Sequence, residues 1–224
     1  MGYTSTVARR FSLLDREYFE ALVTVNDHLA GEGMSACLVG GGAAQAWIAN
    51  LRTGGGAQRL SDEPMLKNVL RKTRDLDFAT RADPAAMLRA LNGLAATTGG
   101  ATVLGPRAVR LGPISVAFTL GPEDLAGMAD YYDRFLESGG ILRLRRGTRI
   151  EEVPTIGIEE LLVTKLTRRG DKAKDILDLV QLFAAARDAG RALNLRAVRG
   201  LLADRPDALG LLDELEERQR EDSH

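Results

Sequence analysis

Hydrophobic positions recur at helical spacing in the first part of the chain. The stripe that runs from Phe11 to Leu29 predicts an amphipathic helix over residues 11–31, closed by Gly31 and Gly33. The next apolar run, 36–39, is short and continuous, which is typical of a buried strand. It ends in three consecutive glycines, and residues 43–51 then predict a second helix.

The pattern is interrupted over residues 52–72, which are polar and contain three more glycines. We interpret this segment as an insertion or mobile loop with a short helix near 64–70. Alternation of acidic and apolar residues over 75–80 then predicts a strand. Asp83 and Pro84 predict the start of a helix that runs to about residue 94, because Asp favours the N-cap and Pro the first helical position.

The rest of the chain divides into a strand-rich part and a helical part. The predicted strands are 101–104, 108–111, 114–120, 141–145 and 148–153, with one helix at about 123–136. The predicted C-terminal helices are 158–168, 172–188, 193–203 and 206–220. We therefore predict an α/β core over 1–154, which contains the insertion 52–72, and a helical region over 155–224.

Composition excludes several classes of protein. The 224 residues are 45% hydrophobic and 27% charged, as in an ordinary globular protein. A single cysteine, Cys37, excludes an intrachain disulfide or a multi-cysteine metal site, and two histidines are too few for a histidine-rich site. The sequence has no apolar run of transmembrane length and no signal-peptide pattern, so we expect a cytoplasmic protein. With a net charge of −1, any nucleic-acid surface must be local.

The first stretch with candidate chemistry is the strand–glycine–helix segment around Gly40, Gly41 and Gly42. Glycines at such a turn let backbone N–H groups approach a phosphate, and the helix dipole favours the anion. The same glycines are equally consistent with a tight turn that has no ligand.

The second stretch contains Asp75 and Asp77, two residues apart on a predicted strand and hence on one face. Two such carboxylates are a typical ligand set for Mg²⁺ with a phosphate substrate. The alternative is that both are edge-strand charges paired with nearby arginines.

The third stretch lies in the C-terminal helices, where three of the five lysines occur. Lys165 could reach a phosphate as a compact positive charge. Alternatively, it forms a salt bridge with Asp175 or Asp178, which lie with Asp171 on one face of the following predicted helix.

In combination, these stretches resemble the nucleotidyltransferase superfamily, which has a polymerase-beta-like fold. The resemblance rests on the strand and Gly-Gly turn, on the Arg-x-Thr-x-Asp-Leu-Asp motif over 71–77, and on the later lysine and aspartates. It spans roughly residues 36–185, and the later lysine and aspartates resemble the helical region of bacterial members, which include the abortive-infection, type IV toxin-like nucleotidyltransferases. The implied fold is a mixed sheet flanked by helices, with a helical C-terminal region.

The resemblance also implies roles for individual residues. The triphosphate would be held by Gly40 and Gly41, and Mg²⁺ (or Mn²⁺) by Asp75 and Asp77. Lys165 would lie near the phosphates, and Asp175 is the best-placed later acid. The residues that flank the acid pair, Thr73 and Arg74, would touch phosphate, although Arg74 could instead hold the strand through a salt bridge.

The activity implied is transfer of an NMP from an NTP to a hydroxyl of RNA, tRNA or protein. A toxin role with an antitoxin partner is its most specific version. The basic cluster Arg143, Arg145, Arg146 and Arg149 could contact RNA phosphates, or could be an ordinary solvated hairpin.

Two features depart from the family pattern. Gly41 and Asp75 are separated by 33 residues, a long interval that marks 52–72 as inserted. In addition, Ala117 occupies the position where the family commonly has a third carboxylate. Either Asp175, Asp133 or Glu123 replaces that acid, or the protein is a non-catalytic module that binds a nucleotide or a partner.

Overall fold

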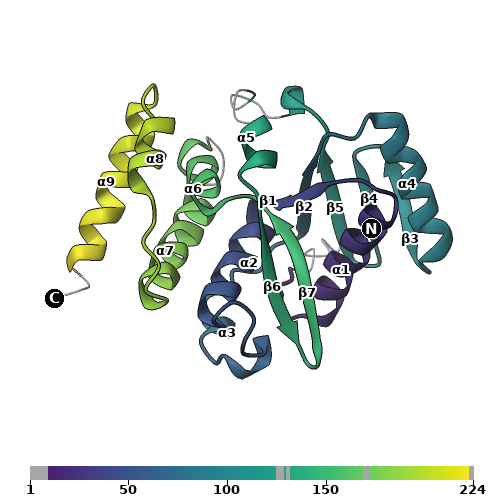
Figure 1. Ribbon diagram of the computed structural model, residues 1–224, viewed down its shortest axis with the longest axis horizontal. Coiled ribbons are helices and arrows are strands. Elements are labelled where there is room, and N and C mark those ends of the chain that lie inside the picture. Colours follow the sequence, from purple (N-terminus) through teal and green to yellow (C-terminus); the bar gives the residue numbers. More distant parts are fainter. Residues whose placement is uncertain (1–9, 125–128, 130–131, 169–171, 222–224) are drawn as a thin grey trace, which may run out of the picture.

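Seven strands form one mixed sheet in the computed structural model, which describes residues 10–124, 129, 132–168 and 172–221 (Figure 1). The strands are β1 Ala36–Val39, β2 Asp75–Thr80, β3 Ala101–Gly105, β4 Ala108–Leu111, β5 Ile114–Thr119, β6 Gly140–Arg146 and β7 Arg149–Thr155. Their order is β3-β4-β5-β2-β1-β7-β6. The β2–β5 and β1–β7 pairs are parallel, and the other neighbours are antiparallel.

Helices cover the sheet and continue beyond its last strand. They are α1 Arg16–Gly31, α2 Gly40–Arg52, α3 Leu66–Val69, α4 Pro84–Thr97, α5 Tyr132–Glu137, α6 Ile158–Thr167, α7 Lys172–Asp188, α8 Leu195–Leu201 and α9 Pro206–Glu221. The predicted fold class is confirmed: a mixed α/β sheet packs against helices, and a helical region follows at the C-terminus (Figure 1). Among the described residues, none of the helices combines the length and apolar character needed to cross a membrane.

The two faces of the central strands have different surroundings. Leu38, Leu76 and Phe78 are buried, and the first turn of α2 packs against Leu38, Leu76 and the α1 residue Tyr18. Because side chains alternate along a strand, Asp75 and Asp77 point to the opposite face. On that face, Ala79 belongs to a small buried apolar cluster with Cys37 and Tyr132, which is separate from the main core.

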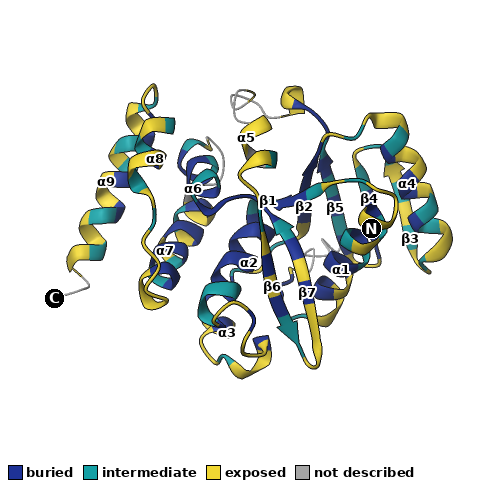
Figure 2. Ribbon diagram, in the orientation of Figure 1, coloured by how far each residue is buried: buried dark blue, intermediate teal, exposed yellow. Residues whose placement is uncertain are grey.

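The C-terminal helices share one hydrophobic core with α2. Trp47 on α2 is buried and donates its indole N–H to the Ile156 carbonyl, at 2.8 Å, in the link between β7 and α6. Buried positions continue from α2 into α6 and α7 (Figure 2). The helical region is thereby held against the start of the sheet.

Three predicted elements need correction. The first helix begins at Arg16, not at residue 11, because Phe11 forms a backbone bridge with Thr73. The second helix begins at Gly40, three residues earlier than predicted, since the glycines join its first turn.

The predicted helix over 123–136 is the third correction. The structure has a 3-10 turn, η2 Pro122–Asp124, and the separate helix α5, while residues 125–128 and 130–131 lie outside the described part. Asp124 accepts a hydrogen bond from the Leu120 N–H and pairs with Arg107, so its carboxylate closes a turn at this point.

The interrupted segment 52–72 contains a 3-10 turn, η1 Leu60–Asp62, and the short helix α3. Leu60 and Leu66 are buried in the main core. Gly56, with φ of 81°, lies so close to the Arg143 carbonyl that a Cβ would be 2.8 Å from its oxygen. The insertion therefore packs against β6.

Candidate functional site

The acid pair lies at the centre of the sheet. Asp77 on β2 is opposite Val39 of β1 on one side and Ala117 of β5 on the other. Asp75 is exposed, whereas Asp77 is half-buried. Burial, and then the charge of Asp75, raise the pKa of Asp77 to about 6. Two carboxylates with this mutual repulsion favour a cation between them.

The start of α2 lies directly against these acids. Gly40 has φ of 63°, and a Cβ at that position would be 2.7 Å from Asp77 Oδ2. At Gly41, a Cβ would be 2.9 Å from Arg71 Nη2 and 3.4 Å from Thr73 Oγ1. Larger residues at these positions would occupy the space between the helix start and the polar side chains, which explains why both are glycine.

The other predicted phosphate contact, Arg74, is exposed. Within the described residues, its side chain has no ion pair, so the alternative of a strand-holding salt bridge is not what the structure shows.

Tyr18 on α1 contributes a contact that the sequence did not indicate. Its hydroxyl donates to the Asp75 carbonyl oxygen at 3.1 Å and so fixes the start of β2. Burial, together with the nearby Asp77 charge, raises the pKa of Tyr18 well above its usual value.

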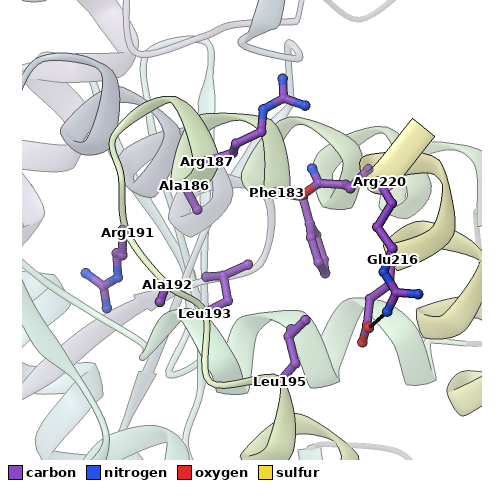
Figure 3. A pocket seen from close by; sticks show the side chains of 10 residues that line it. Phe183, Ala186, Arg187, Arg191, Ala192, Leu193, Leu195, Glu216 and Arg220 are labelled. Atoms are coloured by element: carbon purple, nitrogen blue, oxygen red, sulfur yellow. Dashed lines mark hydrogen bonds and ion pairs between the residues drawn. The ribbon is translucent and has the colours of Figure 1, made fainter. Parts of the chain in front are cut away.

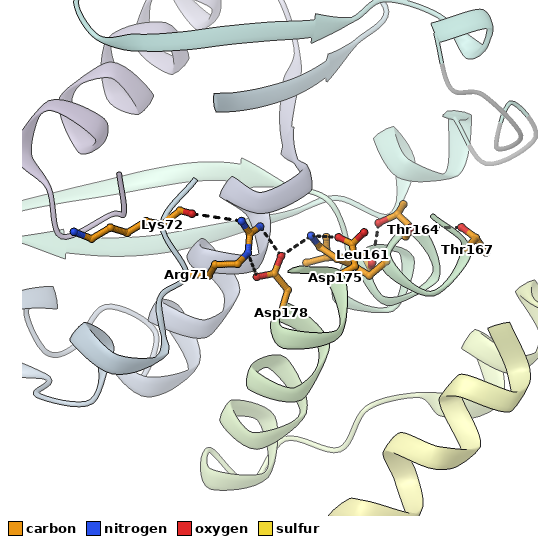
Figure 4. A network of polar contacts seen from close by, with 8 residues as sticks. Arg71, Lys72, Leu161, Thr164, Thr167, Asp175 and Asp178 are labelled. Atoms are coloured by element: carbon orange, nitrogen blue, oxygen red, sulfur yellow. Dashed lines mark hydrogen bonds and ion pairs between the residues drawn. The ribbon is translucent and has the colours of Figure 1, made fainter. Parts of the chain in front are cut away.

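A buried ion network joins the C-terminal helices to the segment before β2 (Figure 4). Lys165 on α6 donates from Nζ to Asp175 at 3.0 Å and to Asp178 at 2.6 Å, both on α7. Asp178 also accepts two hydrogen bonds from Arg71, at 2.8 and 2.9 Å. Lys165 therefore forms the salt bridges that the sequence offered as the alternative to a phosphate contact. These salt bridges are buried, because the Lys165 side chain is only 2% exposed.

This network is close to the acid pair as well. The positive charges of Arg168 and Lys165 both act to lower the pKa of Asp77. The sequence pointed to Lys165, Asp175 and Asp178 but not to Arg71 as a site residue. The sequence feature that could have indicated Arg71 as a site residue is its position at the start of the Arg-x-Thr-x-Asp-Leu-Asp motif. Asp171, also named from the sequence, lies outside the described residues.

The register shows which β5 residues lie beside the acid pair. Ala117 is directly beside Asp77, and Ser115 is beside Asp75. The three acids considered as substitutes each have a cation partner: Asp175 pairs with Lys165, Asp133 with Arg81 and Glu123 with Arg107. In the described part of the chain, no group of three or more metal-ligating side chains is assembled.

The arginine cluster is engaged with the chain itself. Arg145 donates to a backbone carbonyl of the insertion, and Arg146 donates to two carbonyls before α1 and lies over the Phe19 ring. Arg143 and Arg149 form exposed ion pairs with neighbouring acids. Contact of this cluster with RNA stays a prediction.

A cavity of about 460 Å³ lies away from Asp75 and Asp77 (Figure 3). It lies between α7, the segment that links α7 to α8, and α9. Its lining consists of Phe183, Ala186, Arg187, Arg191, Ala192, Leu193, Leu195, Glu216, Gln219 and Arg220. None of the site residues predicted from the sequence lines it.

No protein-family model matches this chain, and no curated protein matches it. Among solved structures, the chain is similar to the crystal structure of an antigenic nucleotidyltransferase-like protein from Paracoccidioides brasiliensis. The identity is 15% and the TM-score 0.48, over 92% of this chain and 95% of that chain. The class is defined by the chain's own elements: an α/β protein with a central mixed sheet, an acid pair on β2 and a glycine-rich helix start beside it.

Proposed function

We propose that the chain is a nucleotidyltransferase that binds an NTP with Mg²⁺ or Mn²⁺ where β1, α2 and β2 meet, and that it transfers an NMP to a hydroxyl acceptor. One observation carries the proposal. In the first turn of α2, Gly40 lies directly against the Asp77 carboxylate and Gly41 lies against Arg71 and Thr73, and Asp75 is on the same face of β2 as Asp77. A phosphate-binding helix start and a metal-binding acid pair are thereby adjacent.

The residues present fit a divalent cation. Asp75 and Asp77 project from one face, and burial and mutual repulsion raise the pKa of Asp77 to about 6. A cation between the two carboxylates relieves that repulsion and offsets the desolvation. When bound, the ion would neutralise charge on the triphosphate and on the group being transferred.

The chain's own groups would hold and orient the nucleotide. Backbone N–H groups at the start of α2 would bind phosphate oxygens, and Arg168 and Lys165 are near enough for their positive charges to act on Asp77. In the transfer, the acceptor oxygen bonds to the α-phosphorus as the bond from that phosphorus to pyrophosphate breaks. The hydroxyl proton leaves to the exposed Asp75 carboxylate or to water.

A second candidate function is a non-catalytic module that binds a nucleotide without turnover. It is favoured by Ala117, which lies beside Asp77 where a third carboxylate would complete the metal site. The pairing of Asp175, Asp133 and Glu123 with cations also favours this candidate, because none of these carboxylates is unpaired.

One experiment separates the two candidates. Transfer from α-³²P-labelled NTPs is measured with Mg²⁺ or Mn²⁺, using total RNA and the protein itself as acceptors, and NTP binding is measured by calorimetry. The test variant is Asp75→Ala/Asp77→Ala. The control, Asp204→Ala/Asp207→Ala, removes the same charge from two exposed positions near the start of α9.

Transfer that is lost only in the test variant supports the enzyme. Binding without transfer, again lost only in the test variant, supports the module. A wild-type protein that neither transfers nor binds overturns both. The RNA, tRNA or protein acceptor, the antitoxin partner and the toxin role stay predictions, and the labelled product identifies the acceptor class directly.

A further inference from the structure

We propose that Arg71 binds the phosphates of the nucleotide and that Asp178 on α7 is the positioning residue that orients it. This inference rests on the function proposed above, and it assigns a role in the nucleotide site to the C-terminal helices.

The hydrogen bonds of Arg71 leave one edge of its guanidinium available. Asp178 accepts from Nε at 2.8 Å and from Nη2 at 2.9 Å, which uses one side of the fork. A guanidinium has five N–H groups, so one on Nη2 and two on Nη1 remain. The contact from Nη1 to the Lys72 carbonyl, at 3.5 Å, is at the limit of a hydrogen bond. The outer edge can therefore bind two phosphate oxygens.

This edge is located at the proposed phosphate site. Arg71 Nη2 lies 2.9 Å from where a Cβ on Gly41 would be, at the first turn of α2. The Arg71 side chain is 15% exposed, so it is largely desolvated but still reachable. An arginine held in this way next to a helix start strengthens the binding of an anion more than a mobile surface arginine does.

Asp178 connects two cations that come from separate parts of the chain. One of its oxygens accepts from Arg71 Nε, and the other accepts both from Arg71 Nη2 and from Lys165 Nζ at 2.6 Å (Figure 4). Its side chain is 3% exposed, so water cannot replace these contacts. Asp178 thus fixes the direction of both positive groups, while Asp175 compensates the second charge.

The experiment compares Arg71→Lys and Asp178→Asn with the wild type. NTP affinity is measured by calorimetry in the presence of Mg²⁺ with each of the four NTPs, and thermal unfolding is recorded without ligand. The matched control is Asp188→Asn, which breaks the Arg52–Asp188 ion pair at 3.1 Å between α2 and α7, away from the acids.

We expect Arg71→Lys and Asp178→Asn each to weaken NTP binding about tenfold or more, because a charge-assisted bidentate contact is lost. In the Arg71→Lys background, Asp178→Asn should have a smaller effect than in the wild type, since the two act through one contact. Asp188→Asn should leave NTP affinity unchanged.

The outcomes are distinguishable. If the wild type binds NTP and both variants bind it equally well, with only their thermal stability reduced, the network is merely structural and this inference is overturned while the proposed function stands. If Asp178→Asn fails to fold, Arg71→Lys still decides, because it keeps the positive charge. A wild-type protein that binds no NTP overturns the proposed function and this inference together.

Discussion

Replacing Asp77 with asparagine should make the ligand-free protein more stable. The side chain is half-buried beside Asp75, and burial and this like charge raise its pKa from 3.8 to about 6. The ionised carboxylate therefore opposes folding at neutral pH. Asparagine has nearly the same shape but carries no charge, so Asp77→Asn removes that cost while it also removes a proposed metal ligand.

The magnitude follows from the pKa. A tenfold change in the acid dissociation constant on folding corresponds to about 1.4 kcal/mol, so a pKa raised to about 6 corresponds to about 3 kcal/mol at pH 8. Because Asp77 is only half-buried, solvent screening reduces the expected gain to about 1–3 kcal/mol. For a chain of this size, that gain raises Tm by about 2–4 °C per kcal/mol.

The sign of the pH dependence is also determined. Between about pH 4 and pH 6, the folded protein binds more protons at Asp77 than the unfolded chain does. This residue therefore makes the wild type less stable as pH rises through that window. The advantage of Asp77→Asn should be about a fifth of its full size at pH 4, about half at pH 5, and complete above pH 7.

The assay is urea unfolding at pH 4, 5, 6 and 8, without metal or nucleotide. Asp62→Asn, at an exposed position of η1, is the control and should change stability by less than about 0.5 kcal/mol. Mg²⁺ with NTP should then stabilise the wild type but not Asp77→Asn. An Asp77→Asn protein less stable than the wild type at pH 8, or a difference that does not shrink towards pH 4, would refute this account of Asp77.

Three further variants test the site. Ala117→Asp adds a carboxylate beside Asp77, so it should increase Mn²⁺ affinity in calorimetry and lower ligand-free stability; unchanged affinity would contradict the geometry. Gly40→Ala should lower the free energy of unfolding in urea by about 1–2 kcal/mol and weaken NTP binding, because φ at Gly40 is positive and the added Cβ meets Asp77. The control Gly99→Ala, which has open space and an ordinary φ, should change neither quantity. Lys165→Met should cost about 3–5 kcal/mol in the same assay, since the buried Asp175 loses its cation partner and Asp178 keeps only Arg71. A loss below about 1 kcal/mol would show that the network is hydrated.

Much of the fold could be predicted because it depends on local patterns. Strands such as 75–80 and helices such as 172–188 matched closely, since alternation and helical spacing reflect one buried face. The N-cap at Asp83 was also predicted, and its carboxylate accepts from the Ala85 and Ala86 N–H groups. The failures occurred where a distant contact decided the backbone, as at Phe11, which pairs with Thr73 and does not join α1.

The candidate site shows the same division. The alternation along β2 is sufficient to put Asp75 and Asp77 on one face, because the side-chain period of a strand is two. The sequence also indicated the glycines and Lys165, as separate features. It did not indicate that Arg71 would meet Asp178, 107 residues later, or that Tyr18 would bond to the Asp75 carbonyl.

What the sequence determined by itself is therefore the set of elements and the local geometry of each motif, because backbone periodicity and glycine conformation are short-range properties. The tertiary structure alone decided the neighbours: Gly40 against Asp77, Ala117 beside that acid, and Lys165 buried between Asp175 and Asp178. The pKa values of such buried charges, and the strength of their ion pairs, depend on packing that excludes water. No local sequence pattern specifies that packing.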